Sequence, residues 1–158
     1  MDLGYNISFT IGAIVINIVL ILIVSINYSS TNIVNKRFRY FLIASLLMFL
    51  LNVATVITNA NAKNLPDLFN QVFNGIYFFS SAIVSVSFFY YCASFALKGA
   101  STKVKRIFLI ANLAGVAIYG IALIINHFNK WYFYFDYAEK FPYKHGWFFM
   151  PINLFSLV

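Results

Sequence analysis

Four long stretches of the chain carry no charged residue, and each is long enough to cross a lipid bilayer. A helix needs about 20 predominantly apolar residues, at 1.5 Å each, to cover a hydrocarbon core of about 30 Å. A backbone exposed to lipid must satisfy its own hydrogen bonds, and these stretches lack the alternation of a membrane β-barrel. We therefore expect four membrane-spanning helices, near residues 9–26, 40–57, 72–97 and 107–125.

The composition excludes an ordinary soluble domain. Only 9% of the residues are charged and 62% are hydrophobic, whereas a soluble domain carries about 25% charged residues. The expected fold class is an all-α integral membrane protein in which residues 1–158 form a single domain. With Cys92 as its one cysteine, the chain cannot form an intrachain disulfide framework.

The charged residues fall between the predicted spans, and their signs differ between the two sides. One side holds seven cations: Lys36, Arg37, Arg39, Lys98, Lys103, Lys105 and Arg106. On the other side four lysines offset four acidic residues: Lys63, Lys130, Lys140 and Lys144 against Asp2, Asp67, Asp136 and Glu139. The positive-inside rule predicts a multi-pass protein of the cytoplasmic (inner) membrane, with the N-terminus outside and both basic loops in the cytoplasm. Such short clusters, with no continuous basic face, give no reason to expect a nucleic-acid partner.

The apolar run at residues 148–158 is too short to cross a bilayer, because 11 residues of helix cover about 17 Å. We favour the interpretation that it is the start of a fifth span in a longer chain. A re-entrant or interfacial segment is the alternative.

Residues suited to chemistry are scarce in the predicted spans. No Asp, Glu, Lys or Arg lies inside any of them, and ionisable groups at membrane depth usually mark proton relays and catalysis. His127 and His145 lack the partner spacing of a metal site, and neither a phosphate-binding glycine loop nor a serine-nucleophile motif is present. We predict no catalytic residue, no metal and no cofactor, so the chain is not expected to be an enzyme by itself.

Polar side chains recur at helical spacing in the second and third spans. Asn52 lies on such a face in the second span, and Asn74, Tyr77 and Ser81 lie on one in the third. These faces should point into the bundle. They either join the helices by hydrogen bonds or line a ligand pocket between them.

The segment 126–147, expected outside the cell, combines aromatic and turn residues. The run from Trp131 to Phe135 has high β-propensity, and Pro142 and Gly146 are turn residues further along the segment. We predict a short β-hairpin here. Its aromatic residues form either an interfacial belt at the headgroups or a lid over a ligand.

If the segment is a lid, three side chains are the candidates for ligand contact. They are Trp131, Asp136 and His145.

Three features resemble a known family. They are the N-terminal end expected outside, the run Asn35 to Phe38 before the second span, and the outer-loop pattern of Trp131 to Asp136 followed by Tyr143, His145 and Gly146. They resemble the membrane-embedded N-terminal regions of Firmicutes diguanylate cyclases of the GGDEF type. Those regions are similar to the seven-helix input modules that precede histidine kinases. The GGDEF string itself is absent from this chain, so no catalytic residue is carried over.

The resemblance implies a membrane sensor upstream of a diguanylate cyclase or kinase domain that is not in this sequence, receiving a small-molecule, periplasmic or extracellular ligand. The alternative is a small multi-span transporter or a solute-binding membrane subunit, in which Asn52, Asn74 and Tyr77 would contact the solute. A third reading is an assembly protein that packs against partner helices. The lipid bilayer is the expected surrounding, and a second copy of the chain in a homodimer is a candidate partner.

Overall fold

The computed structural model describes residues 3–27, 32–139 and 142–149. Within them lie four long helices, α1 (Leu3–Asn27), α2 (Ile33–Ala60), α3 (Asp67–Ala96) and α4 (Thr102–Asn129). Each contains a segment of 21 to 30 residues that is long and apolar enough to cross a membrane. The predicted helical fold with four candidate spans is therefore confirmed, and the chain is an integral, multi-pass membrane protein.

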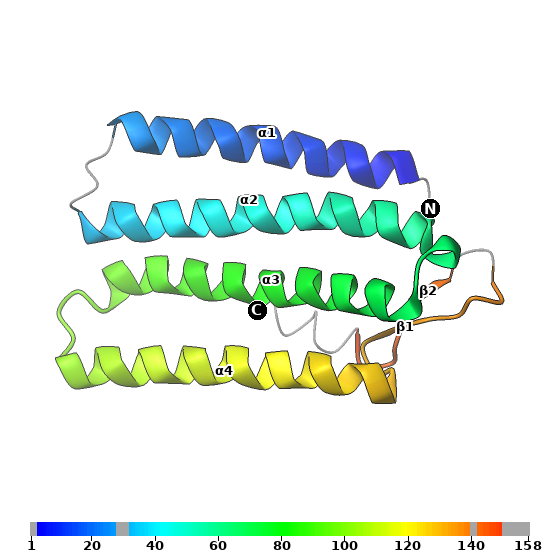
Figure 1. Cartoon of the computed structure of the whole chain (residues 1–158). Helices are drawn as coiled ribbons and strands as arrows, with labels where there is room; N and C mark the ends of the chain where they lie inside the picture. Colours follow the sequence, from blue (N-terminus) through cyan, green and yellow to red (C-terminus); the bar gives the residue numbers. More distant parts are fainter. Residues whose placement is uncertain (1–2, 28–31, 140–141, 150–158) are drawn as a thin grey trace.

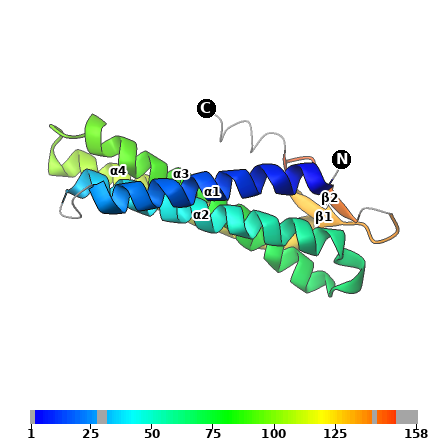
Figure 2. The same ribbon diagram turned by 90° about the horizontal axis from the view of Figure 1, so that it is seen from above.

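The helices run antiparallel and pack in chain order, α1 on α2, α2 on α3 and α3 on α4 (Figure 1). Both views place a small β-hairpin at one end of the bundle (Figures 1 and 2), which we call the hairpin end. The other end, which we call the basic end, contains the α3–α4 connection, the C-terminal end of α1 and the N-terminal end of α2. Because all seven clustered cations belong to those segments, the fold separates the charges as the sequence predicted.

The helices extend beyond the predicted spans, most clearly in α2. It begins at Ile33, capped by the side chain of Asn32, so the basic cluster of residues 36–39 lies inside the helix. Arg39 donates from Nη2 to the carbonyl oxygen of Val24 at 3.1 Å, and Arg37 donates from Nη1 to Ser94 Oγ at 3.0 Å. The hydropathy of the sequence predicts only the part of a helix that lies in lipid. The helix itself can continue beyond that part, because long arginine side chains reach polar groups at the ends of neighbouring helices.

The predicted hairpin is present. After α4 the chain forms β1 (Phe133–Phe135) and β2 (Tyr143–His145), which pair antiparallel with Phe133 opposite His145. Together with the 3-10 helix η1 (Ala62–Asn64) between α2 and α3, the two strands cover the hairpin end of the bundle. Of the predicted partial span at 148–158, only Phe148 and Phe149 lie within the described residues.

A cluster of buried apolar side chains lies where the hairpin packs on α3. It is formed by Ala62, Phe78, Tyr132, Phe133 and Phe135. The Phe78 ring lies 4.6 Å from that of Tyr132 and 5.3 Å from that of Phe133, centroid to centroid. Such aromatic contacts hold the hairpin on α3, so the inner aromatic residues of the loop pack against protein and do not form a belt at the headgroups.

Candidate functional site

A chain of hydrogen bonds connects the hairpin to three helices, and it begins between α2 and α3. The amides of Asn59 and Asn74 bond to each other in both directions, with Nδ2 to Oδ1 distances of 3.2 and 2.8 Å. Asn74 Nδ2 also donates to the carbonyl oxygen of Asn70 at 2.8 Å. Because a buried amide needs a partner for each donor and acceptor, this pair fixes the separation of the two helices.

Asn70 continues the chain towards the hairpin. Its side chain is fully buried, and its Nδ2 donates to the carbonyl oxygen of Ala62 at 3.0 Å and to the hydroxyl of Tyr137 at 3.1 Å. Tyr137 donates that hydroxyl proton to Asp67 Oδ1 at 2.8 Å. One side chain of α3 therefore joins η1 to the loop between the two strands.

The last links reach α4. Gln71 donates from Nε2 to Asp67 Oδ2 at 2.8 Å, and its Oε1 contacts His127 Nδ1. We call the set that shares these bonds the polar network: Asn59, Asp67, Asn70, Gln71, Asn74, His127 and Tyr137. It lies entirely at the hairpin end and contains residues from α2, α3, α4 and the hairpin loop.

Asn126 attaches the hairpin to α4. Its Oδ1 accepts the backbone N–H of Tyr132 at 2.6 Å and that of Phe133 at 3.4 Å, and its Nδ2 donates to the Phe133 carbonyl at 2.9 Å. It is also the one buried residue of α4. Since the rest of that helix is largely exposed, the amide of Asn126 is its main buried link to the hairpin.

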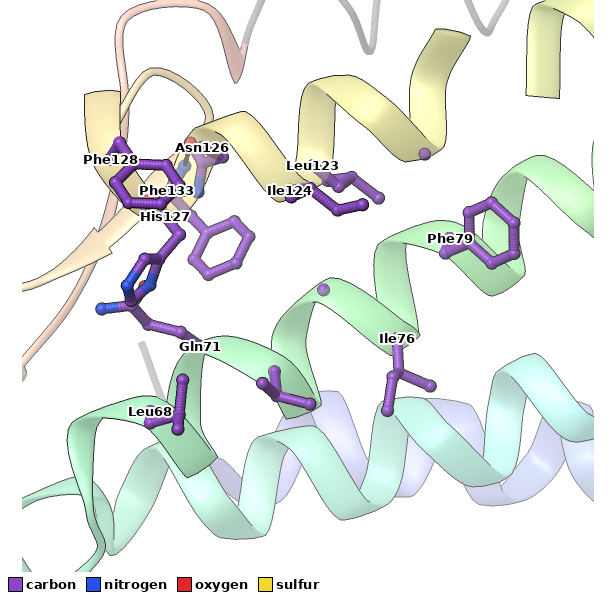
Figure 3. Close-up of a pocket in the computed structure, with 13 residues that line it drawn as sticks. Leu68, Gln71, Ile76, Phe79, Leu123, Ile124, Asn126, His127, Phe128 and Phe133 are labelled. Carbon is purple, nitrogen blue, oxygen red and sulfur yellow. Dashed lines mark hydrogen bonds between the residues drawn. The ribbon is translucent and has the colours of Figure 1, made fainter. Parts of the chain in front are cut away.

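Two adjoining cavities lie beside the network. The larger, of about 570 Å³, is an apolar groove between α3 and α4 (Figure 3). The smaller, of about 220 Å³, is polar and is lined by Asp67, Lys130 and Tyr137 among others. The two share Gln71 and Asn126 in their walls, so the polar cavity opens at the hairpin end of the groove. Cavities of a few hundred Å³ with this division of polarity suit a small amphiphilic ligand.

The four candidate residues in the spans do not gather at one place. Asn74 lies in the polar network, whereas Asn52 donates to Thr10 Oγ1 of α1 at 3.3 Å. Ser81 donates to the carbonyl oxygen of Phe78 in its own helix at 2.7 Å. Tyr77 packs against the aromatic cluster.

The three candidate residues of the loop also lie apart. Trp131 is exposed, and Asp136 Oδ1 accepts the backbone N–H of Ala138 at 3.2 Å, closing a turn. The ring of His145 stacks on that of Phe149, with centroids 3.7 Å apart. None of the three lines either cavity.

Several residues of the site were not among the candidate ligand contacts. The helical spacing does place Asn59 and Asn70 on the predicted polar faces of the second and third spans, so the sequence contained a signal for them. Tyr137 contacts Asn70 across 67 positions of sequence, and no local pattern indicates such a contact. Asn126 follows an apolar run as an ordinary helix-end residue, so its role becomes visible only once the hairpin folds back.

Burial and neighbouring groups change the acidity of two ring side chains outside the spans. Burial raises the pKa of the Tyr137 hydroxyl, and the nearby Asp67 carboxylate raises it further, against a lowering by the Asn70 hydrogen bond. This group therefore keeps its proton for Asp67 at neutral pH. Burial lowers the pKa of His145 from its usual value of 6.5, so the hairpin favours the neutral ring.

Acidification should weaken the hairpin through His145. Because its pKa is lower in the folded state than in the unfolded one, its contribution to stability is complete above pH 6.5 and is lost as the pH falls below that value. We expect the free energy of unfolding in detergent to fall between about pH 7.5 and about pH 5, and to fall less in His145→Gln. If the free energy of unfolding of that variant depended on pH as strongly as that of the parent, the loss of stability could not be assigned to His145.

The fold and the site define a class: a multi-pass membrane protein with a polar network and two cavities at one end, under a β-hairpin. Within residues 3–27, 32–139 and 142–149, no three His, Cys, Asp or Glu side chains are grouped so as to hold a metal ion. No family model, no curated protein and no solved structure matches the chain.

Proposed function

We propose that this chain is the membrane-embedded input region of a bacterial signalling protein, with the hairpin end outside the cell. The observation that carries the proposal is the polar network, because it joins the hairpin loop at Tyr137 to α2 at Asn59 through buried amides. A stimulus that moves the hairpin would therefore act directly on the α2–α3 contact. The output is a diguanylate cyclase or kinase domain on the cytoplasmic side.

The orientation follows from charge. Seven cations lie in the segments of the basic end, and positive residues near span ends are retained in the cytoplasm. The hairpin and both cavities are then exposed to the cell exterior, where a small-molecule ligand would arrive.

The network also has an unused acceptor. Asn70 Oδ1 is buried and has no hydrogen-bond partner among the described residues. An unsatisfied buried acceptor is costly, so a ligand or a second arrangement of the network that supplies a donor would be favoured. Differential affinity for two arrangements is what a sensor requires.

A transporter is the second candidate, and the bonding of its predicted solute contacts argues against it. Asn52 and Asn74 both use their amides between helices, and Tyr77 packs against the aromatic cluster. Solute uptake that weakens when Asn52, Asn74 and Tyr77 are replaced would favour transport instead.

The signalling proposal is tested by breaking the network at the hairpin end and measuring at the basic end. Spin labels at Lys36→Cys and Lys103→Cys, in a Cys92→Ser background, report the distance between the ends of α2 and α4. In lipid nanodiscs, Tyr137→Phe should shift the distance distribution, because it removes the hydroxyl that joins Asn70 to Asp67.

The matched control is Tyr134→Phe in the same hairpin. It removes a hydroxyl for which the described part of the chain shows no hydrogen bond, so its distance distribution should equal that of the parent. If Tyr137→Phe also leaves the distribution unchanged, the two ends are uncoupled and the input role is refuted.

A further inference from the structure

The groove between α3 and α4 has the depth of one bilayer leaflet. On α3 its wall runs from Leu68 at the hairpin end to Phe79, a distance of about 17 Å along the helix axis. Half of a hydrocarbon core of about 30 Å is about 15 Å. The facing wall on α4 runs from Phe128 inwards to Gly120, so the groove starts at the hairpin end and extends towards the membrane midplane.

The groove is also open and apolar where a lipid chain would lie. Leu68, Ile76 and Ile124 line it and are exposed in the chain by itself. Gly75 widens it, since a methyl group added there would meet no atom within 4 Å. In a membrane these walls contact acyl chains, and a groove along two helices holds one chain better than a flat helix surface does.

The polar cavity at the mouth of the groove supplies a positive charge. Asp67, the one carboxylate in its wall, has both oxygens hydrogen-bonded, to Gln71 and to Tyr137. The one ion pair within the described residues joins Lys144 to Glu139, which leaves Lys130 without a carboxylate. An ammonium group at the membrane surface, with Tyr134 in the same cavity wall, is suited to bind a phosphate.

We propose that the groove and the polar cavity together bind one anionic phospholipid from the leaflet on the hairpin side. One acyl chain lies along the groove between Gly75 and Gly120, and the phosphate lies at Lys130. The site shares Gln71 and His127 with the polar network, but the proposal does not rest on the signalling role, because it needs only the α3–α4 contact and the hairpin.

The test is native mass spectrometry of the full chain in detergent, titrated with phosphatidylglycerol and with phosphatidylcholine of the same acyl chains. The unchanged protein should retain phosphatidylglycerol in preference. Lys130→Gln should reduce phosphatidylglycerol retention about fivefold, the value of one basic residue near an anionic lipid. It should reduce phosphatidylcholine retention less, because the choline ammonium offsets the charge of that lipid's phosphate. Gly75→Leu should reduce retention of both lipids, because its side chain fills the groove.

Two control variants separate the site from general effects. Lys63→Gln removes a cation at the hairpin end that does not line either cavity, and Gly115→Leu places the same side chain on an open position of α4 outside the groove. Both should retain lipid like the parent, and circular dichroism should show equal helix content in all variants.

Three results would overturn the proposal. The first is equal retention of the two lipids by the parent, and the second is equal lipid retention by Gly75→Leu and Gly115→Leu. The third is the loss of a dimer of the chain in Gly75→Leu with no change in the amount of bound lipid. The last would assign the groove to a second copy of the chain. Because the readout is bound mass, a failure here leaves the spin-label test of signalling unaffected.

Discussion

Asn126→Ala is expected to release the hairpin from α4 and to lower the free energy of unfolding by about 3 kcal/mol or more, because it leaves three buried backbone groups without a partner at roughly 1–3 kcal/mol each. The groups are the Tyr132 N–H and the N–H and carbonyl of Phe133, which all bond to the Asn126 side chain. Alanine offers them no partner, and the site is buried from water.

The register of the hairpin explains why no other strand replaces Asn126. Gly146 donates its N–H to the Tyr132 carbonyl, and Asp136 donates its N–H to the Pro142 carbonyl. Tyr132 and Gly146 are therefore one hydrogen-bonded pair of the ladder, and Asp136 and Pro142 are another. In an antiparallel ladder such pairs alternate with non-bonded ones, so Phe133, opposite His145, turns its backbone groups away from β2 and towards α4.

The measurement is unfolding by increasing denaturing detergent, followed by circular dichroism, together with protease cleavage of the loop between the strands. Asn112→Ala is the matched control, because the one hydrogen bond of that amide within the described part of the chain goes to the Phe108 carbonyl in the same helix. It should change the unfolding free energy by less than about 1 kcal/mol. Equal effects of the two substitutions would show that Asn126 does not anchor the hairpin.

The helices could be predicted because lipid imposes a simple rule. An uncharged stretch of about 20 residues has few alternatives to a spanning helix, so all four spans follow from the positions of charges such as Arg39 and Lys98. The residues at which the helices begin and end were harder to predict, because a helix such as α2 continues through its own arginines. The hairpin was predictable because aromatic residues with high β-propensity precede turn residues.

The candidate site was harder to predict because it depends on which parts of the chain meet. Periodicity indicated that Asn74 faces a neighbour, and it does. The same periodicity could not distinguish Ser81, which bonds to its own backbone, from Asn70, which bonds to the hairpin loop. The groove depends on two glycines, Gly75 and Gly120, from different helices, and no feature of either helix alone indicates their alignment.

Gly146→Ala is expected to disrupt the return of the hairpin and to cost about 3 kcal/mol of unfolding free energy, at the upper end of overpacking effects. A Cβ at this position would lie 2.0 Å from the Trp131 carbonyl oxygen and 2.6 Å from that of Lys130. Glycine is needed here for space and not for its backbone angle, because no described glycine has a positive φ.

The clash cannot relax cheaply, because the atoms concerned are held. The Trp131 carbonyl accepts the N–H of Phe148 at 2.9 Å, and Gly146 itself donates to Tyr132. Moving either strand breaks these bonds. It also pulls Tyr132 away from Phe78, so the loss spreads from one turn to the aromatic cluster.

Intrinsic fluorescence measures this change directly, because the two tryptophans of the chain, Trp131 and Trp147, both adjoin Gly146. Gly146→Ala should shift their emission and lower the denaturing-detergent midpoint. Gly99→Ala, at an open position outside the helices, should do neither. Parent-like emission and stability in Gly146→Ala would mean that the backbone passes Trp131 at a greater distance, and the packing of the hairpin on α4 would need revision.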